Sequence, residues 1–427
     1  MAAVKTLSEG VRLYAVQTDR FKTSSIAVTM ALPMSTNLSA NALLINVLKH
    51  SCKKYPDFVM LNSRLSELYG ASVGASVIKS GEAQLLTLST VCIDDRFALG
   101  KDEKISAECA DLLCGMLFEP DLKNGKFNSN IVAEEKRLLL QRIDEEINDK
   151  RYYAGVRCEQ ILCRDEAYGK SRYGERAEVE AVTPDDIYDA WQNLLRSARI
   201  MITCVSSSDG KRVEKIFKKG FSKIEREPAE ITTEYRKKAG AFRRVEEKYP
   251  VNQGKLVLGF RTGMSDIDDM HYPEILMIDL FGGNVYSKLF LNVREKLSLC
   301  YYCWAKLHIR KGVVFVDCGI DTENEKKATS EIVKQLQAIR DGDFTDEDMA
   351  ASLMGMRERW LSMDEPMKLC LWYGAQVCDD TLVTPEEKVA KLEKVTKDEV
   401  CAAAKRLSLE AVYMLSAETQ EGKNNED

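Results

Sequence analysis

The chain has 427 residues, of which 45% are hydrophobic and 30% are charged, a composition typical of a folded globular protein. This length is too great for one hydrophobic core, so two or more domains are expected. The formal net charge of -6 gives no electrostatic reason to expect a nucleic acid or an anionic membrane surface as a partner.

Two further features bear on location. The chain starts with MAAVKTLSEGVRLYAVQ, which lacks the apolar core of a secretion signal, and no run reaches the roughly 18 apolar residues that cross a bilayer. Thirteen cysteines, an odd number in apolar surroundings, favour free buried thiols over a disulfide framework. We therefore expect a cytoplasmic protein that enters no membrane.

The first elements in chain order are a strand and a helix. SSIAVTMALPMS (24–35) is an apolar run that ends in a polar loop, as a strand does. LLINVLKHSCKKY (43–55) has the period of an amphipathic helix and contains one of only three histidines. Its polar positions include Asn46, Lys49 and His50, which are candidates for a site.

Further helices follow in the first half. EEKRLLLQRIDEEI (134–147) and CEQILC (158–163) both look helical, and the spacing of five in the latter places its cysteines on different faces. EAVTPDDIYDAWQNLL (180–195) begins with Thr183 before an acidic first turn, which predicts a helix start. The apolar run ARIMITCVSS (198–207) then predicts a strand.

The second half repeats this order. EKVTKDEVCAAAKRLS (393–408) matches the helix at 180–195, and GKLVLGFRTGMS (254–265) matches the strand at 24–35. GDFTDEDMAASLMGMRERW (342–360) likewise matches GKFNSNIVAEEKRLLLQRI (125–143). Two copies of an α+β unit of about 210 residues are therefore expected. The predicted domains are 1–225 and 251–427, with a charged linker at 226–250.

Three other groups were candidates for chemistry. CYYC (300–303) has redox or zinc spacing, but there is no second CxxC pair, and in a strand Cys300 and Cys303 point to opposite faces. Structural thiols are therefore expected. His271, in a loop that opens a helix, and His308, in a strand, lack companions for a triad or a ligand cluster, so structural roles are expected for both.

The helix at 43–55 and the duplication together resemble the pitrilysin, insulysin and mitochondrial processing peptidase family. That family carries the zinc motif H-x-x-E-H on a helix. Laid on this motif, NVLKH has Asn46, Lys49 and His50 in place of His, Glu and His. The family's third ligand, a glutamate on a later helix, falls on Arg142, while Glu135 matches a further family glutamate. The resemblance thus implies that these positions bind no metal and that this chain alone is not a peptidase.

A second stretch, LFGGNVYSKLFLNVREKLSLCYYCWAKL (280–307), also resembles the family. Active members have an arginine and a tyrosine seven residues apart here, which reach the substrate and the developing oxyanion. This sequence has Arg294 and Tyr301 at that spacing. In small members of the family, two chains of this size close like a clam, so that the zinc of one faces the Arg/Tyr pair of the other. The flanking matches are Gly282, Gly283, Ser287, Leu289 and Phe290.

The resemblance implies an α+β fold of two homologous domains, each a mostly antiparallel sheet covered by helices on one face. It implies a bacterial, non-catalytic subunit that binds peptides and supplies Arg294 and Tyr301 to a paralogous, zinc-bearing peptidase subunit. Zinc is then expected only in that partner. The alternative is a structural or peptide-binding homologue with no peptidase role, possibly a homodimer.

Overall fold

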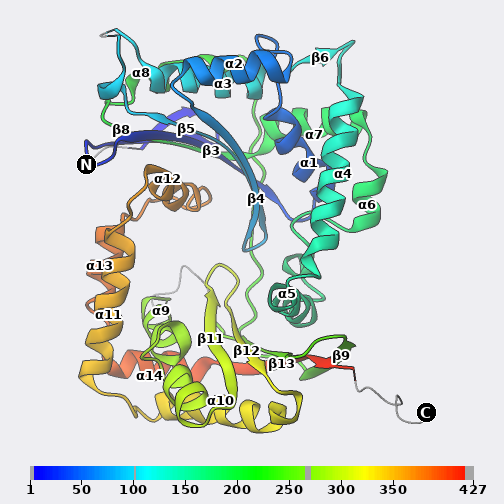
Figure 1. Cartoon of the computed structure of the whole chain (residues 1–427). Coiled ribbons are helices and arrows are strands. Elements are labelled where there is room, and N and C mark those ends of the chain that lie inside the picture. The colour runs from blue at the N-terminus through cyan, green and yellow to red at the C-terminus, as the bar shows by residue number, and fades with distance from the viewer. Residues whose placement is uncertain (1–3, 101, 265–270, 419–427) are drawn as a thin grey trace, which may run out of the picture. The chain divides into compact units, whose positions relative to one another are not determined.

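The computed structural model describes residues 4–100, 102–264 and 271–418, and this part of the chain forms two compact units (Figure 1). Each unit is built around one sheet, and each takes segments from three parts of the sequence. Unit 1 comprises the described residues within 1–143, 170–232 and 362–384; unit 2 comprises those within 144–169, 233–361 and 385–427.

Unit 1 contains a six-stranded sheet in the order β1-β2-β8-β3-β5-β4. Its neighbouring strands are antiparallel except for β2 and β8, which are parallel. The central strand β3 is buried along nearly its whole length, as its apolar sequence predicts. The bounds are β1 (Lys5–Ser8), β2 (Val11–Gln17), β3 (Thr23–Pro33), β4 (Ser72–Ser80), β5 (Ala83–Ile93) and β8 (Arg199–Ser206).

Unit 2 contains a five-stranded sheet in the order β11-β12-β10-β13-β9, in which only β13 and β9 are parallel. Read from β9, this order repeats that of β2-β8-β3-β5-β4 in unit 1, with the parallel pair at the same place. The predicted α+β fold with two similar, mostly antiparallel units is confirmed. The bounds are β9 (Arg243–Tyr249), β10 (Gly254–Arg261), β11 (Cys300–His308), β12 (Val313–Ile320) and β13 (Ser408–Ala417).

Helices pack on both faces of the unit 1 sheet, whereas the sequence predicted helices on one face only. α1, α3 and α7 enclose the larger apolar core, and α12 packs on the opposite face against β3 and β8 (Figure 1). The bounds are α1 (Leu38–Leu48), α2 (Phe58–Glu67), η1 (Asp95–Phe97), α3 (Ile105–Phe118), β6 (Leu122–Lys123), β7 (Lys126–Phe127), α4 (Ser129–Glu146), α6 (Arg176–Ala181), α7 (Pro184–Ser197), α8 (Lys211–Phe221) and α12 (Pro366–Gly374).

The unit 2 sheet is covered in the same way. α9, α10 and α14 lie over one face, and α5 packs on the other against β10 and β13. The bounds are α5 (Lys150–Leu162), η2 (Ala167–Gly169), α9 (His271–Ile278), η3 (Asp279–Gly283), η4 (Leu289–Lys296), η5 (Thr322–Asn324), α10 (Glu325–Arg340), α11 (Asp346–Leu361), α13 (Pro385–Leu392) and α14 (Lys397–Arg406).

The two units exchange one helix each. α5 comes from the first half of the chain but packs on the unit 2 sheet, while α12 comes from the second half and packs on the unit 1 sheet. The predicted ranges 1–225 and 251–427 are each continuous in sequence, whereas each compact unit combines segments from both halves of the chain. Residues 222–242 form no helix or strand, and β9 lies inside the predicted linker 226–250.

Two repeated helix starts have the predicted chemistry. The Thr183 side chain accepts a hydrogen bond from the Asp186 backbone N–H, and the Asp186 side chain accepts from the Thr183 N–H. Thr396 and Glu399 form the same reciprocal pair at the start of α14. Such a capping box satisfies two backbone donors that an unprotected helix start leaves free, so both predicted starts are confirmed.

A buried ionic network holds unit 2 together. Arg261 on β10 lies 2.5 Å from Glu166 and 3.2 Å from Glu410, and Lys311 lies 2.6 Å from Glu166. Burial alone would raise the pKa of Glu166, but the hydrogen bonds from Arg261 and Lys311 lower it. The network thus connects Glu166, in the segment after α5, to β10 and β13 of the unit 2 sheet, which come from the second half of the sequence.

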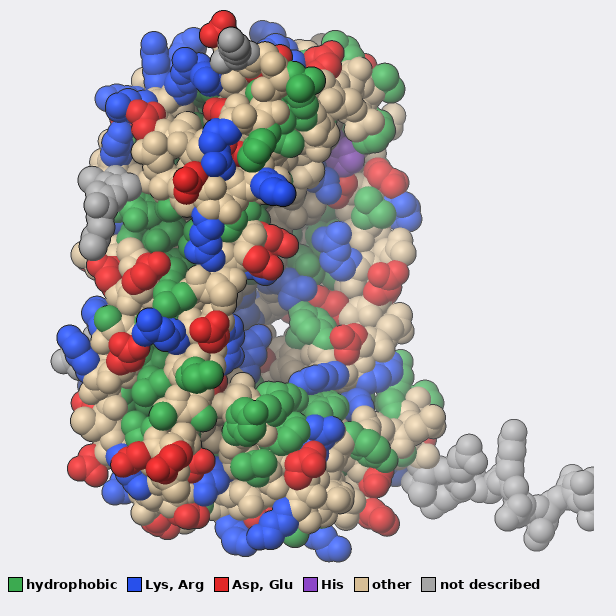
Figure 2. Space-filling view, turned by 60° about the vertical axis from the view of Figure 1, so that its left-hand side comes forward, with side chains coloured by type: hydrophobic (Ala, Val, Ile, Leu, Met, Phe, Trp, Pro, Cys, Tyr) green, Lys and Arg blue, Asp and Glu red, His purple; other side chains and the backbone are tan. Residues whose placement is uncertain are grey.

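The surface shows charges of both signs. On the face drawn in Figure 2, the described Lys and Arg side chains are interspersed with Asp and Glu over most of the surface. Among the described residues, the helices are all too short or too polar to cross a bilayer.

Candidate functional site

The first candidate position is the end of α1, which is shorter than predicted. The helix ends at Leu48, and its residues are all buried, so the predicted amphipathic helix over 43–55 is wrong in both extent and character. The reason is competition for backbone hydrogen bonds: the Cys52 N–H bonds to the Tyr55 carbonyl and the Lys53 N–H to the Glu119 carbonyl, which turns the chain out of the helix.

The polar residues of this region have separate partners. Asn46 is buried and donates from Nδ2 to the carbonyl of Ala42, one turn earlier in its own helix. His50 is half-buried, and its Nε2 lies 2.5 Å from Oε1 of the buried Glu135 on α4. Glu135 is thus the side chain that meets His50.

Two cations complete this region. Arg142 lies two turns after Glu135 on α4, and its charge and that of Lys49 both act on the Glu135 carboxylate. Burial alone would raise the pKa of Glu135, but the hydrogen bond from His50 and these charges lower it. The structure therefore brings Lys49, His50, Glu135 and Arg142 together, while the Asn46 side chain is engaged by its helix.

These residues do not fit a zinc ion. Zinc sites in proteins need three or four nitrogen, sulfur or carboxylate ligands. Here one imidazole and one carboxylate are hydrogen-bonded to each other, and the positive charges of Lys49 and Arg142 oppose a cation. No catalytic step through zinc follows from this arrangement.

The second candidate region begins with the glycine pair at the end of η3. A Cβ atom at Gly282 would lie 2.7 Å from the backbone N of Ala305 on β11, a distance that real Cβ contacts do not show. Only glycine therefore lets this segment pack against the strand. The segment that follows leads into the π-helical η4. Within it, Ser287 Oγ donates a hydrogen bond to the Asn284 carbonyl.

Arg294 and Tyr301 are both accessible. The side chain of Arg294 on η4 is 40% exposed, with its guanidinium 4.6 Å from the ring centre of Phe290 and 3.7 Å from Glu295. Tyr301 on β11 is 60% exposed, and its hydroxyl makes one long hydrogen bond of 3.4 Å to Asp321. Both side chains thus present donors that are not consumed by strong internal partners.

The strand that carries Tyr301 contains a β-bulge. Cys300 pairs with Ile320 and Tyr302 with Gly319, so Tyr301 is an extra residue in β11. The expectation that Cys300 and Cys303 point to opposite faces is therefore wrong, because the bulge shifts the alternation by one residue. Both thiols lie in the same apolar core.

Cys318 on β12 joins these two thiols. The three Sγ atoms lie within 4.8 Å of one another, and those of Cys303 and Cys318 are 2.8 Å apart. Hydrogen bonds from Cys303 and Cys318, with a smaller effect of the Arg294 charge, lower the pKa of Cys300 to about 4. The sequence search missed this group because Cys318 comes from a neighbouring strand.

The remaining sequence candidates have structural partners. Nδ1 of His308 lies 2.6 Å from the hydroxyl of Tyr168, and the His271 ring contacts the Tyr272 ring at a tilt of 39°, with ring centres 3.8 Å apart. Cys158 and Cys163 are buried in one apolar cluster under the unit 2 sheet, where burial raises the pKa of both. All thirteen cysteines are described, and all are free thiols, as predicted.

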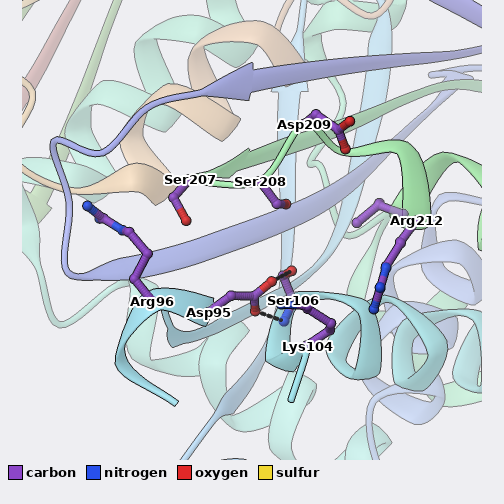
Figure 3. A pocket seen from close by; sticks show the side chains of 9 residues that line it. Asp95, Arg96, Lys104, Ser106, Ser207, Ser208, Asp209 and Arg212 are labelled. Carbon is purple, nitrogen blue, oxygen red and sulfur yellow. Dashed lines mark hydrogen bonds between the residues drawn. The ribbon is translucent and has the colours of Figure 1, made fainter. Parts of the chain in front are cut away.

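Unit 1 also has a pocket of about 300 Å³ that sequence reasoning missed (Figure 3). Asp95 lies at its edge and accepts hydrogen bonds of 2.8 Å from both the backbone N–H and the hydroxyl of Ser106. The pocket combines cations with carboxylates, so its lining has no single charge. Its other polar residues come from two segments far apart in the sequence: Arg96, Lys104, Ser207, Ser208, Asp209 and Arg212.

Comparisons with known proteins bear on these two regions. A family model described as "Peptidase M16 inactive domain" matches residues 181–356, which include the glycine pair and the Arg294/Tyr301 region. The chain is 31% identical over 415 residues to the "Probable inactive metalloprotease YmfF" of Bacillus subtilis (strain 168), covering 96% of this chain and 97% of that protein. This chain belongs to the inactive M16 peptidases. The resemblance expected from the sequence is confirmed.

Solved structures show the same fold over the whole chain. A conserved protein from Enterococcus faecalis V583 is 26% identical, with a TM-score of 0.87, and the match covers 99% of this chain and 100% of that one. A Pseudomonas fluorescens structure described as a peptidase M16 inactive domain is 15% identical, with a TM-score of 0.81 and coverage of 99% and 100%. At that identity the likeness concerns the fold alone.

Proposed function

We propose that this M16 homologue is the non-catalytic, substrate-binding subunit of a heterodimeric zinc peptidase. In this role it supplies Arg294 and Tyr301 to the zinc site of an active paralogue, which hydrolyses peptides. Zinc belongs to the partner subunit only. The chain alone performs no hydrolysis.

The contrast between the two candidate regions carries this proposal. At the first, the ligand set is reduced to one imidazole and one carboxylate among cations. At the second, the arginine and the tyrosine that active relatives use are both retained and exposed. A chain that served only as a scaffold would have no need to keep two such donors accessible.

The chemistry of these donors suits a peptide carbonyl. The Arg294 guanidinium offers fixed, charged N–H donors to a carbonyl or a developing oxyanion. The Tyr301 hydroxyl adds a neutral donor, and its present bond to Asp321 is long enough to be exchanged easily. Donors of this kind accelerate acyl transfer when they bind the transition state more strongly than the ground state.

A second candidate is a peptide-binding protein with no peptidase role. It is favoured by the position of β11, which carries Tyr301 and forms one edge of the unit 2 sheet. An edge strand can pair with an extended peptide through backbone hydrogen bonds alone. The two candidates differ in whether a partner confers activity.

The test begins with purification of the tagged chain from its own cells and identification of any stoichiometric partner. A partner with an intact H-x-x-E-H motif is expected, and the reconstituted pair should cleave unstructured peptides. Arg294→Ala should then lower kcat by about 100-fold, as loss of an oxyanion donor does. Tyr301→Phe should lower kcat by about five- to tenfold, the value of one neutral hydrogen bond.

Matched controls separate this role from general damage. Arg357 is an exposed arginine of the same unit, and Tyr286 is a similarly exposed tyrosine. Arg357→Ala and Tyr286→Phe should leave kcat within twofold or so of the parent. Full turnover by both Arg294→Ala and Tyr301→Phe, with the complex intact, would exclude the proposed role. Failure of any partner to confer activity would favour the peptide-binding candidate.

A further inference from the structure

We propose that Cys300, Cys303 and Cys318 bind one thiophilic divalent cation of the Zn²⁺ class on the core face of the unit 2 sheet. This site is distinct from the positions on α1 and α4 that correspond to the zinc site of active relatives. It is also independent of the proposed peptidase role, because its test measures metal binding by the isolated chain.

The geometry of three sulfur atoms on two paired strands carries the proposal. Cys303 and Cys318 are direct partners across β11 and β12, and the bulge at Tyr301 brings Cys300 to the same face. Among the residues that the structure describes, this is the one group of three or more Cys, His, Asp or Glu side chains close enough to share an ion. Spacing along the chain, C-x-x-C plus one distant cysteine, is compatible with such a site.

The distances need little change for binding. With a metal–sulfur distance of about 2.3 Å, sulfur atoms on one ion are roughly 3.8–4.0 Å apart in tetrahedral or trigonal geometry. The three Sγ atoms lie within 4.8 Å of one another, and the closest pair is at 2.8 Å. Rotation of the side chains by about 1 Å at the sulfur atoms therefore reaches the required set without movement of the strands.

The surroundings favour an ion that is held rather than exchanged freely. Cys303 and Cys318 are fully buried, while Cys300 is 8% exposed and marks the side from which an ion enters. A water molecule at that side would complete a four-coordinate site. M²⁺ binds the three sulfur atoms as thiolates, so binding forms three M–S bonds and releases to solvent each proton that the thiols still hold, with no change of oxidation state. The resulting single negative charge lies near the guanidinium of Arg294.

The experiment uses the full chain, purified under reducing and metal-free conditions, with Cd²⁺ as the spectroscopic probe. We expect one Cd²⁺ per chain and a sulfur-to-cadmium charge-transfer band in the ultraviolet, which stoichiometric Zn²⁺ removes. Cys303→Ser and Cys318→Ser should each weaken binding by roughly 100-fold or more, because a ligand is lost. Cys158→Ser is the matched control: this thiol is equally buried, lies in another apolar cluster, and should leave binding unchanged.

Each possible outcome decides the question. If either serine variant fails to fold, Cys300→Ser at the accessible edge replaces it, and Cd²⁺ should raise the Tm of the wild type but not that of this variant. Absence of the band in the wild type overturns the proposal, as does a band that persists when these cysteines are replaced. The proposal is also overturned if the chain takes up no metal and two of its thiols can no longer be titrated after exposure to air. Cys303 and Cys318 would then be a pair that forms a disulfide.

Discussion

Asp94, which follows β5, accepts hydrogen bonds from two residues that line the pocket of unit 1, Arg96 and Ser207, and Asp94→Asn is expected to destabilise that unit. The side chain is 1% exposed. Its carboxylate accepts hydrogen bonds from Ser24 Oγ at 2.8 Å, Arg96 Nε at 2.6 Å, and both the Oγ and backbone N–H of Ser207 at 2.6 and 2.9 Å. Asparagine keeps the shape but loses the charge that strengthens all of these bonds.

The magnitude follows from the pKa of Asp94. Burial alone would raise this pKa, but the hydrogen bonds from Ser207, Arg96 and Ser24 lower it from 3.8 to about 2. Each unit of pKa corresponds to about 1.4 kcal/mol, so the ionised carboxylate stabilises the fold by about 2 kcal/mol. Because the pKa is lower in the folded than in the unfolded chain, this stability is present above about pH 4 and is lost as the pH falls toward 2.

The assay is thermal unfolding of wild type and Asp94→Asn, first near neutral pH and then along an acid series. For a unit of roughly 200 residues, the variant should lower Tm by about 4–8 °C at neutral pH. The difference should shrink below about pH 4 as the wild type is protonated. Asp209→Asn, at an exposed carboxylate beside the same pocket, is the control and should change little. Equal stability at neutral pH, or a difference that persists unchanged in acid, would refute the reasoning.

Two other predictions concern charges that the fold holds in place. The combined change Asn46→His, Lys49→Glu and Arg142→Glu should add one equivalent of bound zinc, measured by elemental analysis. Adding His50→Ala to this variant should remove that zinc again. An unchanged metal content in the combined variant would mean that these positions do not correspond to a zinc site. Glu166→Gln should destabilise unit 2 by about 3–5 kcal/mol in chemical denaturation, because Arg261 and Lys311 lose the buried carboxylate that they share. A decrease in the free energy of unfolding of less than about 1 kcal/mol would show that water already stabilises the charges of this network.

Much of the fold could be predicted because its signals are local. The capping boxes at Thr183 and Thr396 are readable within four residues, and the apolar strands of the repeat have the same form in both halves. The end of α1 could not be read, because it is set by hydrogen bonds to Tyr55 and to the distant Glu119. Periodicity alone continues the helix past Leu48.

Of the candidate functional residues, Arg294 and Tyr301 could be predicted from the sequence, whereas the thiol group and the partner of His50 could not. The positions of Arg294 and Tyr301 follow from a continuous motif, and the structure places both at the surface. The thiol group was missed because strand alternation assumes a regular ladder, and the sequence around Tyr301 does not reveal the bulge. The partner of His50 was not anticipated either, since Glu135 is 85 residues away in the chain.

The exchange of α5 and α12 has a consequence for synthesis on the ribosome. The unit 1 sheet is complete once β8 has been made, but the helix that covers its second face follows only at residues 366–374. The apolar side of this sheet, including Tyr14, Leu85 and Met201, therefore stays uncovered while most of unit 2 is translated. Nascent chains exposing such a face attract chaperones and misassociate readily. Expression of the first half alone should accordingly yield an aggregating product rather than a stable domain.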